Sequence, residues 1–217
     1  MMRRLCLVAA AALLLGGCMS IRKELQTGDL IFVGIPYDYQ LDSASIDSAI
    51  SASTSDSLRL IHTAIVEVQG DSTWIIDATI KRGVARYPLK DFLQDFTLKD
   101  GSLPVFYVKR LKQPYDVKDF VERAKSFIGQ PYDFYFLPDN DAMYCTELVR
   151  ESYRPEGNQY LFQNKPMNFQ DENGEYPLYW VQLFDKLEVP IPQGVMGTNP
   201  EAMATSVLLR DMPPLQP

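Results

Sequence analysis

The sequence predicts an α+β fold in which an antiparallel sheet is covered by a few helices. Residues 60–79 contain two β-branched, apolar segments separated by a short turn, which is typical of a β-hairpin. Residues 116–129 show apolar side chains at helical intervals. Together, the expected strands and helices imply an α+β architecture.

Five segments are expected to form strands, each an apolar or β-branched run bounded by turn residues. They are residues 29–34, 60–68, 73–79, 84–87 and 104–109. The turn of the hairpin is Gln69-Gly70-Asp71-Ser72. Residues 36–57 are rich in Ser and Asp and are expected to form a connecting segment at the surface, with a short helix near residues 46–50.

The clearest helix lies between Asp116, its predicted N-cap, and Gly129, its predicted stop. Its apolar face is expected to contain Val117, Phe120, Val121, Ala124, Phe127 and Ile128. Other helices are expected at residues 89–96, 143–153 and 177–186, and one begins at Asn199-Pro200-Glu201.

The N-terminal residues have the layout of a secretory signal. Arg3 and Arg4 precede an apolar run, residues 5–15, that is short for a membrane span. Leu15-Gly16-Gly17-Cys18 resembles the lipobox of bacterial lipoproteins, in which the signal is removed before a cysteine that becomes lipidated. We therefore expect a signal peptide over residues 1–17, lipidation of Cys18, and attachment to a membrane of the cell envelope.

Removal of the signal leaves 200 residues, which suit one domain. We expect a lipidated tether at residues 18–27 and the domain at residues 28–217. The mature chain would carry 19 Lys and Arg against 28 Asp and Glu, a net charge of −9. This charge argues against a nucleic-acid partner, and contact with a membrane is expected through the lipid anchor.

The cysteine count is informative because export exposes thiols to oxidation. Cys6 leaves with the signal and Cys18 is used in lipidation, so Cys145 remains unpaired and no disulfide is expected. A lone thiol in such a compartment is either buried and inert or chemically active. One His and one Cys without further clustered ligands do not predict a zinc site, so no metal or other cofactor is expected.

Cys145 and His62, the only histidine, suit the two central roles of a thiol hydrolase. With Asp141 as N-cap, Cys145 would be the fourth residue of its helix, where the amide dipoles favour a thiolate. Facing residues of the hairpin sum to 139 or 141, which places Asp77 opposite or diagonal to His62 on one face. Glu67 is expected on the other face.

Five segments together resemble the YiiX/YaeF-like group of circularly permuted, NlpC-type papain-like hydrolases. They are Gly28-Asp-Leu-Ile-Phe, Ile61-His-Thr-Ala-Ile-Val, Ile75-Ile-Asp-Ala, Gly129-Gln-Pro-Tyr-Asp and Tyr144-Cys-Thr-Glu-Leu-Val. The resemblance implies a permuted papain-like fold, with the histidine strand before the cysteine helix. It also implies Cys145 as nucleophile, His62 as base and Asp77 as the residue that orients the base, where many relatives have Glu.

Three tyrosines are weaker candidates for substrate binding. The backbone N–H of Cys145 is the expected first oxyanion donor, and Tyr37 or Tyr144 is a candidate for the second. Tyr132 lies in an aromatic segment that either lines the cleft or packs in the core.

These features leave three functions open. The first is an envelope amidase or peptidase that cleaves a peptidoglycan-type peptide or an N-acylated amino compound through a thioester. The second is an acyltransferase or thioesterase that acts on lipid, because permuted papain-like folds also resemble lecithin:retinol acyltransferases. The third is a lipoprotein that binds such a ligand without catalysis, which the Cys145 and His62 pair argues against.

Overall fold

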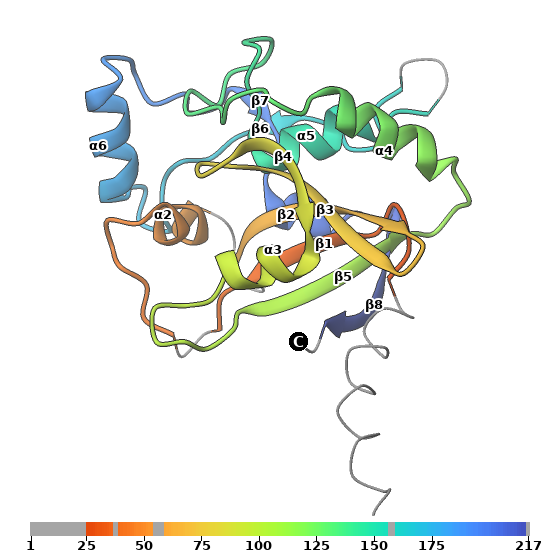
Figure 1. Ribbon diagram of the computed structural model, residues 1–217. Helices are drawn as coiled ribbons and strands as arrows, with labels where there is room; N and C mark the ends of the chain where they lie inside the picture. Colours follow the sequence, from red (N-terminus) through yellow and green to blue (C-terminus); the bar gives the residue numbers. More distant parts are fainter. Residues whose placement is uncertain (1–24, 37–38, 54–58, 156–158, 216–217) are drawn as a thin grey trace, which may run out of the picture.

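The protein is described by a computed structural model that covers residues 25–36, 39–53, 59–155 and 159–215. Its centre is a six-stranded antiparallel sheet with the strand order β4-β3-β2-β1-β5-β8 (Figure 1). The strands are β1 (Leu30–Gly34), β2 (Leu60–Gln69), β3 (Ser72–Thr79), β4 (Gly83–Pro88), β5 (Val105–Leu111) and β8 (Leu209–Leu215). Two short strands, β6 (Lys165–Pro166) and β7 (Met196–Gly197), form a separate pair.

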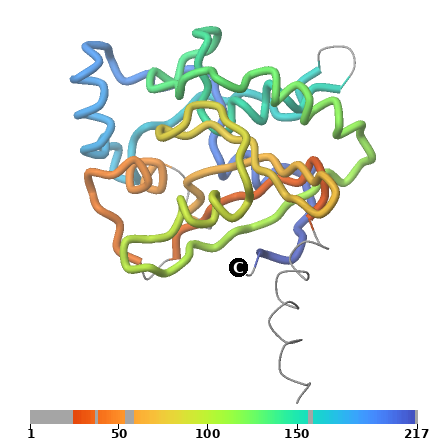
Figure 2. Tube along the Cα trace, in the orientation of Figure 1, coloured from red at the N-terminus to blue at the C-terminus, as the bar shows by residue number. Residues whose placement is uncertain are grey.

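The helices of the described ranges are α2 (Ile46–Ser53), α3 (Leu89–Asp95), α4 (Val117–Ser126), α5 (Cys145–Ser152), α6 (Leu178–Lys186) and α7 (Pro200–Ala204). Figure 1 shows α4 and α5 on one side of the sheet and α6 beside α2 at the end of the molecule. The tube in Figure 2 shows the same arrangement, and α2 and α6 are in contact. The expected α+β fold is therefore confirmed.

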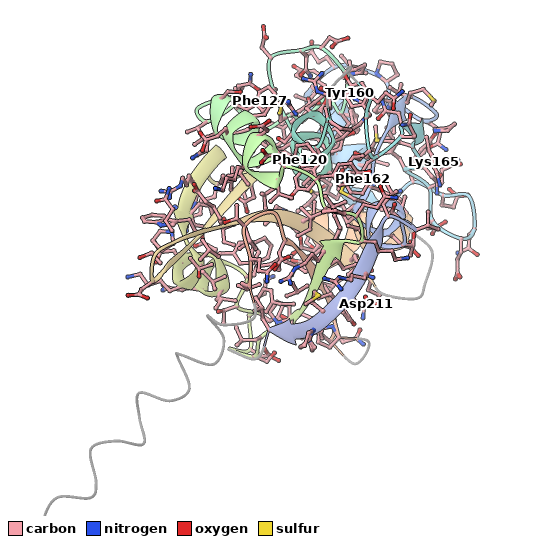
Figure 3. The ribbon with its side chains drawn as sticks, turned by 90° about the vertical axis from the view of Figure 1, so that its right-hand side faces the viewer. Phe120, Phe127, Tyr160, Phe162, Lys165 and Asp211 are labelled. Carbon is pink, nitrogen blue, oxygen red and sulfur yellow. The ribbon has the colours of Figure 1, made fainter. Side chains whose placement is uncertain are left out.

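The alternation of side chains along the strands divides the core between two faces of the sheet. On one face, Ile65 and Ile76 pack with α4, α5 and the segment that follows α5. Phe120 of α4 and Phe162, both labelled in Figure 3, belong to this core. On the other face, Val66 and Ile75 pack with α3.

Helix α4 shows how closely local signals determine an element. Asp116 is its N-cap and accepts a hydrogen bond from the backbone N–H of Lys118 at 3.2 Å, as the sequence predicts. Gly129 has a positive φ of 97°, and its N–H donates to the carbonyl of Val84. The expected apolar face is wrong at its end, because Ile128 lies past the helix and is 45% exposed.

Residues 1–24 lie outside the described residues, and so do the predicted signal, the candidate lipidation site at Cys18 and Tyr37. Residues 25–27, which the sequence assigns to the tether, already pack: Leu25 is buried and Thr27 Oγ1 bonds to the backbone of Val68. Within the described ranges, no helix has the length and apolar character needed to cross a membrane.

Candidate active site

A loop of unusual backbone geometry presents Cys145. Asp133 is fully buried, and its carboxylate accepts hydrogen bonds from the backbone N–H groups of Tyr135 and Leu137 at 2.8 and 3.0 Å. Asn140 donates to the same carboxylate at 2.9 Å. These bonds close the loop that precedes α5, so a buried aspartate fixes where the helix can begin.

The start of this helix differs from the prediction. Tyr144 is the N-cap and Cys145 is the first helical residue, whereas the sequence placed the N-cap at Asp141. Asp141 instead adopts a left-handed conformation with a φ of 56°. Because the first N–H groups of a helix have no partner within the helix, the N–H of Cys145 is free to serve as an oxyanion donor.

His62 lies near the start of β2, on which α5 packs. Facing residues of β2 and β3 sum to 141, as in the pair Ile65 and Ile76, which is one of the two predicted registers. Asp77 is therefore a diagonal neighbour of His62. Its Oδ2 lies 2.9 Å from His62 Nε2, which confirms that Asp77 reaches the imidazole.

Glu67 occupies the opposite face of β2, as predicted. Its carboxylate bonds to Arg86 of β4 at 2.5 Å and to Lys125 of α4 at 3.0 Å. These two cations lower the pKa of Glu67, although its burial acts in the opposite direction. Glu67 therefore belongs to a structural ion cluster that is separate from His62.

The electrostatics of His62 tie it to both partners. Burial alone would lower its pKa, but the charge of Cys145 and hydrogen bonds with Asp77 and Cys145 raise that pKa to about 10. Nε2 is held by Asp77, so Nδ1 is the ring nitrogen left for the thiol. The arrangement favours a protonated imidazole beside Cys145.

Two cavities meet at Cys145. One, of about 60 Å³, has a mainly aromatic and apolar lining that includes Tyr132, Tyr144, Phe169 and Trp180. The other, of about 210 Å³, lies beside His62 and has a mixed lining, in which apolar side chains such as Ile61 lie beside the charged Asp47 and Lys81. It adjoins a further cavity of about 390 Å³, with Asp47 lining both. Cys145 therefore lies between a small apolar pocket and a larger groove of mixed lining.

The candidate tyrosines differ in what they can offer. Tyr132 lines both cavities at Cys145, and its hydroxyl pKa is raised first by burial and then by the charge of Cys145. The ring of Tyr144 lines the apolar pocket. Its hydroxyl accepts from the N–H of Thr198 at 3.1 Å and faces the sulfur of Met167, so it is engaged elsewhere.

Three residues near His62 were not foreseen. Asp47 of α2 lines the larger groove, and burial raises its pKa while the charge of His62 opposes that rise. Phe96 stacks on the imidazole with ring centroids 4.8 Å apart. Tyr87 of β4 donates a hydrogen bond to Asp77 at 2.8 Å. The turn at residues 80–82 is the one signal that could have placed Tyr87 beside Asp77, through the register of β3 and β4.

The geometry agrees with the comparison to known proteins. Residues 24–211 match the family described as permuted papain-like amidase enzymes, YaeF/YiiX, C92. The chain belongs to this family. Along the chain, the strands of His62 and Asp77 come before the helix of Cys145. The resemblance to the permuted group implied that the histidine strand precedes the cysteine helix, and the family match agrees with it.

Relatives within the YaeF/YiiX family include the uncharacterized protein YiiX of Escherichia coli K12. It is 28% identical over 133 residues, which cover 59% of this chain and 57% of YiiX. The match thus spans little more than half of that relative. A crystal structure titled as that of metalloprotein YiiX from Escherichia coli O157:H7 has a TM-score of 0.67 at 21% identity, covering 89% of this chain and 99% of that one. The fold is therefore shared over nearly the whole of both chains.

Proposed function

We propose that this protein is a cysteine amidase or peptidase of the cell envelope in which Cys145 is the nucleophile and His62 the base. One observation carries the proposal: His62 is held by Asp77 through Nε2 and lines the same cavity as Cys145. Nucleophile, base and orienting carboxylate in this relation are the minimum set for thiol hydrolysis.

The proposed reaction has two steps. The thiolate of Cys145 attacks the amide carbon, and the backbone N–H of Cys145 donates to the developing oxyanion. The imidazolium of His62 gives its proton to the leaving amine, and the C–N bond breaks to leave a thioester. Neutral His62 then takes a proton from water, which attacks the thioester carbonyl and releases the acid and the thiolate.

The two cavities suggest the substrate. The apolar pocket suits the acyl side of the scissile bond, and the charged groups of the larger groove, Asp47 and Lys81, suit a charged or hydrogen-bonding leaving group. An N-acylated amino compound fits this division, and a peptidoglycan-type peptide with a small apolar residue on its acyl side fits it as well. The same apolar pocket supports transfer of an acyl group from lipid as the second candidate.

The proposed steps proceed without a metal ion. The YiiX of Escherichia coli O157:H7 is described as a metalloprotein. In the described part of this chain, no group of three or more His, Cys, Asp or Glu side chains is placed to hold a metal ion. The groups that act in the proposed reaction are the side chains of Cys145 and His62 and the backbone N–H of Cys145.

The test is to trap the acyl-enzyme. The protein is incubated with N-acyl amino acids, a muropeptide and a phospholipid, and intact-mass spectrometry is used to detect an adduct on Cys145. Cys145→Ala is the matched control. An adduct from the amides with release of free amine supports the proposal. An adduct from the phospholipid alone would assign the lipid-directed reaction, and binding without an adduct would leave a non-catalytic lipoprotein.

We further propose that the protein is anchored in an envelope membrane through lipid on Cys18. The proposal is supported by the Leu15-Gly16-Gly17-Cys18 pattern behind two arginines. Mass spectrometry of the N-terminus after expression in bacteria should show cleavage before Cys18 and added acyl chains, and Cys18→Ser should abolish both. An unmodified or differently cut N-terminus would contradict the anchor.

A further inference from the structure

The carboxylate of Asp77 is held by more than the histidine it faces. Asp77 is completely buried. Its Oδ2 accepts from Tyr87 at 2.8 Å as well as lying 2.9 Å from His62 Nε2. Its Oδ1 is buried and has no hydrogen-bond partner within the described structure. A single oxygen of the pair therefore makes both contacts.

The strand register explains why Tyr87 is there. Asp77 faces Ala85 and Ile75 faces Tyr87 across β3 and β4, so Asp77 and Tyr87 are diagonal neighbours on one face of the sheet. Tyr87 is 6% exposed, and the guanidinium of Arg82 stacks over its ring at 4.3 Å. The phenol is thus held in place from both sides.

A second donor on Oδ2 has a physical consequence. A carboxylate that contacts only an imidazole is free to rotate about its last bond and exchange its two oxygens, because either can accept the ring N–H. The hydroxyl of Tyr87 fixes Oδ2 toward His62. It also stabilises a charge that burial would otherwise make costly.

We propose that Tyr87 is a positioning residue, whose hydroxyl fixes Asp77 and thereby holds the imidazole of His62 in the orientation that faces Cys145. Tyr87 does not line either of the two cavities at Cys145, and it acts through Asp77. The inference rests on the proposed function in one respect, the catalytic purpose of holding the imidazole of His62 toward Cys145. The chain of contacts from Tyr87 through Asp77 to His62 is a property of the fold.

The hydroxyl of Tyr87 stays a donor over a wide pH range. Burial, followed by the charge of Asp77, raises its pKa well above the ordinary value. It therefore keeps its proton under all conditions in which the protein is expected to be folded.

The test removes one oxygen atom, with Tyr87→Phe. Tyr153→Phe is the matched control, because Tyr153 is also buried and its hydroxyl also donates one hydrogen bond, at 2.9 Å to the carbonyl of Gly28. His62 is the only histidine, so in protein without a histidine tag its hydrogen-bonded Nε2 proton gives a single downfield NMR signal. The rate of Cys145 alkylation by iodoacetamide at pH 6 is the second measurement.

Both variants should lower the urea midpoint of unfolding by a similar amount, because each loses one buried hydrogen bond. Only Tyr87→Phe should broaden or shift the His62 signal and slow alkylation, by about 3-fold, which is within the range that loss of one hydrogen bond costs and less than the loss of Asp77 itself. If Tyr87→Phe leaves both the signal and the rate as in Tyr153→Phe, then Tyr87 is only structural and the inference is overturned.

A double-mutant cycle with Asp77→Asn makes the test independent of folding losses. If Tyr87 acts through Asp77, Tyr87→Phe should not slow alkylation further in the Asp77→Asn background, and additive effects would contradict the proposal. The two proposals also fail separately. Slow alkylation of the wild type would contradict the proposed thiol hydrolase. A His62 signal that still depends on Tyr87 would nevertheless support the positioning role of Tyr87.

Discussion

Two buried carboxylates lie on opposite faces of the same hairpin, and they have opposite kinds of partner. Glu67 is paired with two cationic side chains, those of Arg86 and Lys125. Asp77 is paired with His62, a base whose charge depends on Cys145, and with the neutral hydroxyl of Tyr87. The first arrangement fixes β2 to β4 and α4, whereas the second keeps a proton available beside a thiol. Burial of an acid alone therefore does not mark a catalytic site; the protonation chemistry of its partners does.

The largest expected effect is on the reactivity of Cys145, and it should distinguish the His62 face of the hairpin from the Glu67 face. His62→Ala should slow iodoacetamide alkylation of Cys145 at pH 6 by about 100-fold, because an ordinary thiol is ionised to only roughly 0.3% at this pH. Glu67→Gln should leave the rate within about 2-fold of the wild type. Mass spectrometry of the alkylated protein measures both. Equal, slow labelling of the folded wild type and His62→Ala would show that Cys145 is inert.

The second prediction concerns the charge of His62. NMR titration of the single imidazole should give a pKa of about 10 in the wild type. In Cys145→Ala it should fall toward the ordinary value of about 6.5, because the negative charge of Cys145 is lost. Glu67→Gln should not move it. A wild-type pKa near 6.5 would mean that the thiol and the imidazole are not coupled.

The raised pKa of His62 also makes the free energy of unfolding depend on pH. Protonated His62 stabilises the folded state fully below its unfolded pKa of about 6.5, and this contribution is lost as the pH rises through about 10. The free energy of unfolding should therefore fall more steeply between pH 7 and pH 10 in the wild type than in His62→Gln.

The hairpin was the part of the site that the sequence determined best. The turn left two registers open, and both placed His62 and Asp77 on one face with Glu67 on the other, because the alternation of a strand is insensitive to a shift of two. The register found sums to 141. Local strand chemistry thus predicted a contact between residues fifteen positions apart.

The start of the cysteine helix could not be predicted in the same way. Asp139 and Asp141 look like N-caps, but both adopt positive φ values, and Asp133 supplies the side-chain acceptor for the loop. Aspartate suits caps and left-handed turns alike, so composition does not distinguish them. Strand β8 was missed because Pro213 and Pro214 argue against a strand, and they are tolerated here because β8 is at the edge of the sheet.

A third prediction sharpens the role of the carboxylate on the His62 face. Asp77→Ala should slow alkylation of Cys145 by about 10-fold, less than His62→Ala does, because Asp77 orients the imidazole without touching the sulfur. The loss should appear at pH 6 in protein that remains folded by circular dichroism. A loss as large as that of His62→Ala would mean that Asp77 contributes by charge as much as by orientation.

Glu67→Gln, on the face of the hairpin opposite His62, should have the smallest effect on Cys145 and the clearest effect on stability. Glu67→Gln should reduce the free energy of unfolding by about 1–3 kcal/mol, below the usual cost of breaking a fully buried ion pair because the side chains of Arg86 and Lys125 are 21% and 23% exposed. Glu122→Gln is the matched control, since Glu122 pairs with the same Lys125 but is 68% exposed, and it should cost at most about 0.5 kcal/mol.

Because the folded-state pKa of Glu67 is lowered, its contribution to stability is present above the unfolded pKa and is lost as the pH falls through the folded value. Urea unfolding at pH 7 and pH 3.5 should therefore show the difference between wild type and Glu67→Gln shrinking at the lower pH. A difference that stays constant would assign the effect of Glu67 to packing rather than to its charge.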